Sequence, residues 1–136
     1  MADALQVELV SPEKVIFSGE ANMVITRTAG GGGELAFQAG ALVESHTRIF
    51  LTDGTIQDVA VHRGFIEVSG NPTRVSILSD VAELADEIDI DRAKEALERH
   101  QLILKTESVE AHVADAVAGK ARAQARLTAT GTGFTA

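Results

Sequence analysis

The sequence changes its pattern once, within the stretch Ser76 to Glu95 (SILSDVAELADEIDIDRAKE). Before this stretch, short apolar runs alternate with polar residues and are separated by glycine-containing turns, which is typical of β-strands. After it, apolar residues recur at helical spacing almost to the C-terminus. The pattern predicts a β domain over residues 1–84 and a helical unit over residues 85–136.

The β half predicts several short strands. Apolar residues alternate with polar ones from Leu5 to Leu9, and a short second strand is expected from Lys14 to Phe17, ended by Ser18-Gly19. A further strand is expected over residues 20–28. Short strands with no helices between them predict an antiparallel β-sandwich rather than a parallel sheet.

Three glycine-containing segments predict turns. Asp53-Gly54 between two β-rich runs indicates a tight hairpin, because Asp and Gly tolerate the positive φ of such a turn. Gly70-Asn71-Pro72 indicates a second hairpin. The run from Gly30 to Gly33 lacks the following Lys-Ser/Thr and the spacing of a phosphate-binding loop, so a hairpin loop is expected there.

The second half predicts an antiparallel helical hairpin. Asp89 is a suitable N-cap, and apolar spacing continues from Ile90 to Leu104. A turn follows, with Ser108 as the expected N-cap of a second helix over residues 109–127, and residues 128–136 read as a frayed tail. The apolar face of that helix is expected to comprise Val109, Val113, Ala116, Val117 and Ala121. These side chains are mostly small, so the hairpin is expected to be weakly held and movable.

Charge and composition exclude several classes of function. Residues 1–88 contain 5 Lys/Arg and 13 Asp/Glu, a net charge of 5 − 13 = −8, whereas residues 89–136 contain 7 of each. This acidity and the absence of Trp and Tyr argue against nucleic-acid binding. There are no cysteines, no apolar run long enough to span a bilayer and no pattern of a signal peptide, so a cytosolic protein is expected.

The β half contains no recognisable catalytic or metal site. His46 and His62 lack a third ligand at plausible spacing, so they are expected on strand faces or the surface. Three carboxylates, Asp53, Asp58 and Glu67, are expected in solvent. No nucleophile–base pair accompanies them, and an enzyme is therefore the least supported class.

Four arginines of the helical half are spaced to share helix faces. Antiparallel pairing is expected to place Arg92 level with residue 122, near Asp89 and Glu83. One interpretation is solvated pairing, such as Glu95 with Arg99; the other is an anion site, because guanidinium groups bind phosphate oxygens in pairs. The four are Arg92, Arg99, Arg122 and Arg126.

Three segments of the chain together resemble the epsilon subunit of bacterial F-type ATP synthases. They are LQVELVSPEKVIFSGEANMVITRT, DVAVHRGFIEVSGNPTRVSILSDVAE and ADEIDIDRAKEAL. The resemblance implies a non-catalytic rotor subunit whose sandwich docks on the gamma subunit and the c-ring. It also implies a hairpin that extends toward the alpha/beta hexamer and blocks ATP hydrolysis. Such a subunit lies at the cytoplasmic face of the cell membrane, held there only through the complex.

The resemblance also implies a regulatory ligand. No cofactor is expected to be required, but some members bind ATP in the folded hairpin through a motif Ile/Leu-Asp-x-x-Arg-Ala. Four residues match this motif, namely Ile88, Asp89, Arg92 and Ala93. Four more are similar to the supporting ligands, namely Glu83, Arg99, Arg122 and Arg126. A stand-alone nucleotide-binding module is the alternative function.

The chain departs from the family in one region. The family has a Gly-His-x-Pro segment after the glycine run, whereas here Phe37 to Gly40 leads directly to Ala41 to His46 without a proline. A loop and part of a strand are expected to be missing, which leaves the c-ring contacts unassigned. Either a weakened sandwich or an exposed sheet edge is expected there.

Overall fold

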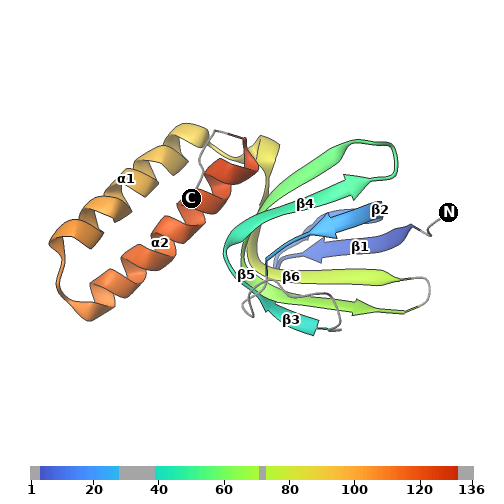
Figure 1. Cartoon of the computed structure of the whole chain (residues 1–136), viewed down its shortest axis with the longest axis horizontal. Helices are drawn as coiled ribbons and strands as arrows, with labels where there is room; N and C mark the ends of the chain where they lie inside the picture. Colours follow the sequence, from blue (N-terminus) through green and yellow to red (C-terminus); the bar gives the residue numbers. More distant parts are fainter. Residues whose placement is uncertain (1–3, 28–38, 71–72, 132–136) are drawn as a thin grey trace.

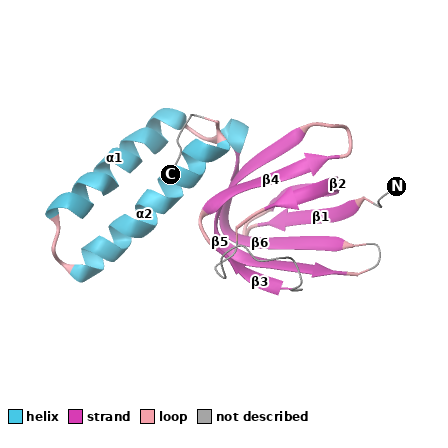
Figure 2. Ribbon diagram, in the orientation of Figure 1, coloured by secondary structure: helices cyan, strands magenta, loops and turns pink. Residues whose placement is uncertain are grey.

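The computed structural model describes residues 4–27, 39–70 and 73–131, with the side chains of residues 39 and 40 excepted. It consists of a six-stranded β-sandwich and a hairpin of two helices (Figure 1, Figure 2), which confirms the predicted fold class. The predicted glycine loop at residues 30–33, the residues Asn71-Pro72 and the end of the tail lie outside the described residues.

The strands close into a flattened barrel. They are β1 (Leu5–Val10), β2 (Val15–Ile25), β3 (Ala39–Leu42), β4 (Ser45–Leu51), β5 (Ile56–Ser69) and β6 (Arg74–Leu84). Their order is β3-β5-β4-β2-β1-β6, with a further pairing between β5 and β6. The first half of β5 pairs with β4 and its second half with β3, so β5 belongs to both layers. The pairs among the described strands are antiparallel except β1–β6, which is parallel.

The hairpin predicted at Asp53-Gly54 is confirmed, whereas the predicted break at Ser18-Gly19 is wrong. Gly54 has a φ of 92°, and Asp53 accepts hydrogen bonds from the backbone and hydroxyl of Thr55. Strand β2 runs without interruption because Ser18 and Gly19 pair with Glu8 and Val7 of β1. A long cross-strand ladder here outweighs the low β propensity of the two residues.

The sandwich core is aliphatic and lies between the two layers. Leu9, Ile49, Val59, Val61 and Ile77 are fully buried in it. The paired strands β5 and β6 approach closely at Gly64 because this residue lacks a side chain: a Cβ there would lie 1.9 Å from the carbonyl oxygen of Leu78. The same residue has a φ of 148°, which L side chains rarely adopt.

The chain leaves β6 through a short helix, η1 (Ala85–Glu87), and enters α1 (Ile90–Thr106) and α2 (Glu110–Ala129). Asp89 is confirmed as the N-cap of α1, since its side chain accepts a hydrogen bond from the backbone N–H of Arg92 at 3.0 Å. The prediction that Ser108 caps α2 is wrong. Glu107 accepts hydrogen bonds from the N–H groups of Ser108 and Val109 instead, because its longer side chain reaches forward over the turn.

The buried face of α2 differs from the predicted one. Ala116 of the predicted face is buried, whereas Val109 and Val117 are half exposed, at 50% and 54%. The other buried positions of α2 are small residues and one leucine, namely Gly119, Ala123, Ala125, Leu127 and Ala129. Small residues occur along two faces of α2, and only the tertiary contacts decide which of them is covered. The helix also continues past residue 127 to Ala129.

Helix α2 contacts both α1 and the sandwich. Ala123 and Leu127 pack with Ala93 and Leu97 of α1. The C-terminal part of α2 lies against β4 and β5 (Figure 1). There Ala125 and Ala129 pack with Ala60 of β5 and Ile88 of the connection, so small side chains let the helix approach the sheet closely.

Candidate functional site: a polar cavity beside the helical hairpin

A cavity of about 560 Å³ opens where α1, α2 and the end of β6 meet. This volume is within the usual range of small-molecule sites. Most of its lining side chains are polar or charged, and they come from all three elements. They are Glu83, Glu87, Asp89, Arg92, Ala93, Glu95, Ala96, Arg99, His100, Gly119, Arg122 and Arg126.

Seven of the eight residues expected from the sequence line this cavity, and Ile88 does not. Ile88 is 9% exposed and packs with Ala60, Ala125 and Ala129 at the junction of the hairpin and the sandwich. The residue expected to open a ligand motif therefore holds the connection in place. Asp89 and Arg92, the next two residues of the motif, line the cavity.

Three of the four arginines have unpaired guanidinium groups within the described part of the chain. Arg92, Arg99 and Arg122 make no ion pair or hydrogen bond through their guanidinium groups there. The expected pair between Glu95 and Arg99 is likewise not formed among these residues. Unpaired guanidinium groups around a cavity attract anions, and phosphate oxygens suit their planar donors.

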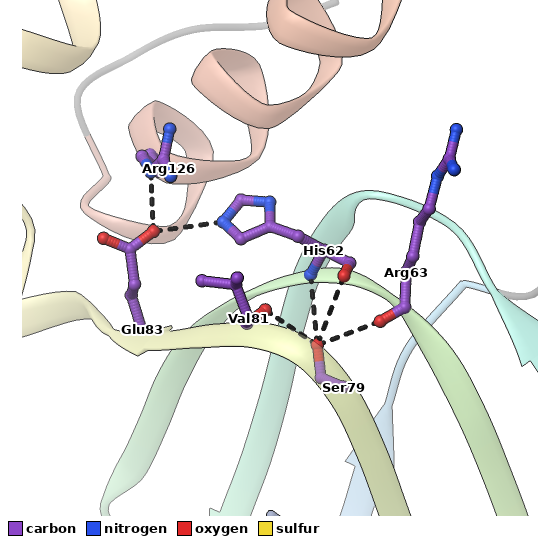
Figure 3. A network of polar contacts seen from close by, with 6 residues as sticks. All are labelled: His62, Arg63, Ser79, Val81, Glu83 and Arg126. Carbon is purple, nitrogen blue, oxygen red and sulfur yellow. Dashed lines mark hydrogen bonds and ion pairs between the residues drawn. The ribbon is translucent and has the colours of Figure 1, made fainter. Parts of the chain in front are cut away.

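The fourth arginine joins the hairpin to the sandwich. Arg126 Nε of α2 donates a hydrogen bond to Glu83 Oε1 of β6 at 2.6 Å, and His62 Nε2 of β5 lies 3.1 Å from the same oxygen (Figure 3). Because a carboxylate only accepts, His62 donates from Nε2. These contacts, first with His62 and then with Arg126, lower the pKa of Glu83 to about 2.

His62 is buried rather than on the surface. It is 3% exposed, and its Nδ1 is buried with no partner among the described residues. The backbone around it is fixed by Ser79, whose hydroxyl accepts from the N–H of His62 at 3.3 Å (Figure 3). The same hydroxyl lies 2.7 Å and 3.0 Å from the carbonyl oxygens of Val81 and Arg63, to either of which it can donate. Arg63 has a φ of 57°, and this network holds that uncommon conformation.

His100 and Gly119 set the register of the two helices. A Cβ at Gly119 would lie 2.3 Å from both Cε1 and Nε2 of His100, so the imidazole occupies the space that a side chain would need. Arg92 and Arg122, which were predicted to lie level with each other, line the same cavity.

Sequence reasoning missed five lining residues. Glu87, Glu95, Ala96, His100 and Gly119 were not among the residues expected to bind a ligand. The spacing on α1 could have identified Ala96 and His100, since they lie four and eight residues after Arg92 and share its helix face. No such signal identifies Gly119, whose role depends on the register of the hairpin.

The other titratable residues form local structural contacts. His46 Nε2 lies 2.6 Å from Asp58 Oδ1, and Arg48 Nε donates to the same oxygen at 3.0 Å. Asp58 is thus partly buried and paired, not free in solvent as expected, because three polar side chains share one face of β4 and β5. The described residues contain no group of three or more potential metal ligands. No helix among the described residues is long and apolar enough to cross a membrane.

The chain is similar to known proteins over nearly its full length. Residues 4–85 match the family described as ATP synthase, Delta/Epsilon chain, beta-sandwich domain. The ATP synthase epsilon chain of Streptomyces avermitilis is 43% identical, over 73% of this chain and 82% of the relative. The ATP synthase epsilon chain of Solibacter usitatus is 38% identical, over 93% of this chain and 96% of the relative.

A solved structure has the same fold. A chain of the Euglena gracilis mitochondrial ATP synthase (OSCP/F1/c-ring, rotational state 1) matches with a TM-score of 0.78 and 18% identity. The match covers 93% of this chain and 80% of that one. The family match over most of the sandwich and the bacterial relatives agree with the architecture described above. The chain therefore belongs to the family of ATP synthase epsilon chains, the non-catalytic stalk subunits of that enzyme.

Proposed function

We propose that this chain couples rotation to proton flow in an F-type ATP synthase and that its hairpin regulates ATP hydrolysis by responding to ATP. In this proposal the hairpin binds ATP while folded against the sandwich. When ATP leaves, the hairpin extends along the gamma subunit toward the alpha/beta hexamer and blocks hydrolysis. A ligand that binds only the folded form shifts this equilibrium in proportion to its preference for that form.

The observation that supports ATP as the ligand is the set of unpaired arginines around one cavity. Arg92, Arg99 and Arg122 are available to the phosphate oxygens of a nucleotide. Carboxylates of Glu87 and Asp89 in the same cavity are acceptors for the donors of a base or ribose. Because both helices contribute, a ligand here would bridge them and favour the folded hairpin.

The partners follow from the family. We expect the sandwich to dock on the gamma subunit and the c-ring, which would hold the chain peripherally at the cytoplasmic face of the membrane. The acidic sandwich favours basic surfaces on these partners. The extended hairpin would contact the alpha/beta hexamer.

Calorimetry on the isolated chain tests the nucleotide site. We expect ATP to bind with 1:1 stoichiometry and Arg122→Ala to weaken binding at least tenfold, about 1.4 kcal/mol, since it removes one charged donor pair. Lys105→Ala, an exposed cation at the end of α1, is the matched control and should bind as the unmodified chain does. ADP is titrated in parallel. Absence of ATP binding to the unmodified chain would reject the site, and so would an equal loss of ATP affinity in Arg122→Ala and Lys105→Ala.

A second assay tests the regulatory role. The chain is added back to a synthase core that lacks this subunit, and ATP hydrolysis is followed with and without residues 88–136. Inhibition by the full chain but not by the shortened one is expected. The unpaired arginines also favour the alternative of a stand-alone nucleotide-binding module; saturable ATP binding with no affinity for the core would select it.

A further inference from the structure

His100 occupies a confined position in the cavity wall. Its ring lies against Gly119 of α2, where a Cβ would lie 2.3 Å from two ring atoms, and it lines the cavity beside the unpaired arginines. The Nδ1 atom is buried and has no hydrogen-bond partner among the described residues. A buried polar atom without a partner costs free energy, and its presence in the wall of a polar cavity points to a ligand.

The charges that face His100 come from both helices. Arg99 precedes it on α1 and Arg122 lies opposite on α2, and neither guanidinium is neutralised by an ion pair in the described structure. Glu95 lies on α1 nearer the start of the helix. Of the remaining carboxylates of the cavity, Asp89 is the N-cap of α1, about 16 Å from His100 by helix rise, and Glu83 and Glu87 belong to β6 and η1.

These surroundings disfavour a protonated imidazole at His100. Burial, followed by the positive charges of Arg99 and Arg122, lowers the pKa of His100 from its ordinary value of 6.5. His100 is therefore neutral at pH 7. A polyphosphate bound to the same two arginines would neutralise the charges that oppose protonation.

We propose that His100 is part of the ligand site and that binding of a polyphosphate in this cavity is coupled to uptake of a proton by the His100 imidazole. This inference rests on the proposed nucleotide function and adds a residue and a pH dependence to it. The protonated ring supplies a third positive charge beside Arg99 and Arg122, and the negative charge of the polyphosphate stabilises it.

The direction of the pH dependence follows from linkage. The ligand-bound form holds its proton to a higher pH than the free form, so affinity rises as pH falls through the interval between the two pKa values. Above both values no proton is taken up. A rise of one pKa unit on binding corresponds to a gain of at most tenfold in affinity.

Calorimetry on the full chain measures this directly. ATP is titrated at pH 6.0 and pH 8.0 in pairs of buffers with different ionisation enthalpies, which gives the number of protons taken up. The terminal phosphate of ATP also titrates near pH 6, so the diagnostic quantity is the difference between variants. His100→Gln removes the titrating group, and His112→Gln, an exposed histidine on α2 paired with Glu107, is the matched control.

We expect the unmodified chain and His112→Gln to take up about half a proton more at pH 6.0 than His100→Gln does. Their gain in affinity from pH 8.0 to pH 6.0 should exceed that of His100→Gln about threefold to tenfold. Equal proton uptake in all three proteins would overturn the inference and leave ATP binding intact. If ATP does not bind the unmodified chain at either pH, the proposed nucleotide function fails as well.

A second measurement uses the unmodified chain alone, so it does not depend on whether His100→Gln folds. NMR titration of the four imidazoles in the unmodified chain gives the pKa of His100 with and without saturating ATP. A higher pKa of His100 in the ATP-bound chain is expected, with no comparable change at His46. An unchanged or lower pKa would overturn the proposal.

Discussion

Glu83 is the side chain through which the last strand of the sandwich contacts both a neighbouring strand and the second helix. It accepts from His62 of β5 and from Arg126 of α2 through the same oxygen. Both contacts are stronger with the ionised carboxylate than with the neutral acid, and they therefore lower the pKa of Glu83 to about 2. The contact is partly shielded from water, since the side chain of Glu83 is 29% exposed.

The ionisation of Glu83 predicts a specific pH dependence. Its pKa is about 2 in the folded chain against 4.5 ordinarily, so its contribution to stability is present above pH 4.5 and is lost as pH falls toward 2. We expect Glu83→Gln to reduce the free energy of unfolding by about 1–2 kcal/mol at pH 7 and by less at pH 3. Urea unfolding at both pH values measures this. Glu67→Gln, at an exposed position on β5, should have no effect; a loss independent of pH would contradict the assignment.

Sequence reasoning identified most of the cavity residues but not their contacts. Asp89 and Arg92 could be predicted because they belong to a family motif, and Arg99 because it shares a helix face with Arg92. The burial of His62 could not, because a strand pattern does not show which helix later covers that face of the sheet. The pairing of Arg126 with Glu83 joins positions 43 apart in sequence, beyond any local periodicity.

At the level of elements, the two helices are packed through small side chains. Ala93 and Ala123 lie in their contact, whereas at Gly119 the large ring of His100 fills the gap. Gly119 would ordinarily cost a helix about 1 kcal/mol relative to Ala. Here the glycine provides the space that the imidazole occupies.

Gly119→Ala is therefore expected to destabilise the hairpin although alanine favours helices. The new Cβ would lie 2.3 Å from ring atoms of His100, and such overpacking costs about 1–3 kcal/mol. His100→Ala in the same chain should relieve the clash and recover at least part of the loss. Helical circular dichroism during urea unfolding measures both variants. A stable Gly119→Ala chain would show that the ring can move aside freely.

The cap of α1 gives a second element-scale prediction. Asp89 satisfies the free N–H of Arg92 at the start of the helix. Asp89→Ala should cost about 1 kcal/mol and Asp89→Asn considerably less, because an amide oxygen also caps. Asp91→Ala, in the same first turn but without the capping bond, is the control for charge alone. If Asp89→Ala and Asp91→Ala unfold at the same urea concentration, the cap makes no contribution.

The elements themselves were largely predictable, and their ends were not. The Asp53-Gly54 turn and the start of α1 follow from local chemistry that acts within four residues. Strand β2 was predicted in two pieces because Ser18-Gly19 looks like a break unless the pairing with β1 is known. The cap of α2 was missed because Glu107 and Ser108 are both able to accept the free N–H groups.

In the whole molecule, the sandwich and the hairpin each have an apolar cluster of their own, and a third, smaller cluster lies between them. That shared cluster consists of Ala60, Ile88, Ala125 and Ala129, and the Glu83–Arg126 ion pair accompanies it. Three of these four side chains are alanine, so little apolar area holds the two parts together. This small contact area is consistent with the predicted division into two units near residue 84. That the two units can separate remains a prediction.

Ala60→Glu tests whether the hairpin can separate while the sandwich stays folded. Ala60 is fully buried beneath α2. Arg126 is the cation of the described interface, and it already forms an ion pair with Glu83. A carboxylate at position 60 would therefore be buried and unpaired. We expect hydrogen exchange to accelerate at least tenfold in α2, and to remain unchanged in the core strands β1 and β4. Ala41→Glu, at an exposed alanine of β3, is the control. Equal acceleration throughout the chain would show that the two parts unfold together.

The topology was the least predictable feature at this scale. The sequence predicted antiparallel strands, and the parallel β1–β6 pair joins the first strand to the last. Nothing local encodes that pairing, since it depends on the closure of the whole barrel. The short strand β3 stands at one end of the sheet order and, among the described strands, pairs with β5 alone, in the region where part of a strand was expected to be missing.

The closure by β6 has a mechanical consequence. This strand is hydrogen-bonded to β1 on one side and to β5 on the other, and it continues directly into the hairpin. A force that pulls on the hairpin along β6 is therefore resisted by two ladders loaded in shear, where many bonds must break at once. The same force applied across the sheet would open the bonds one after another. In a subunit built in this way, the helices can change their orientation under torque while β6, the strand to which they are joined, remains hydrogen-bonded in the sheet.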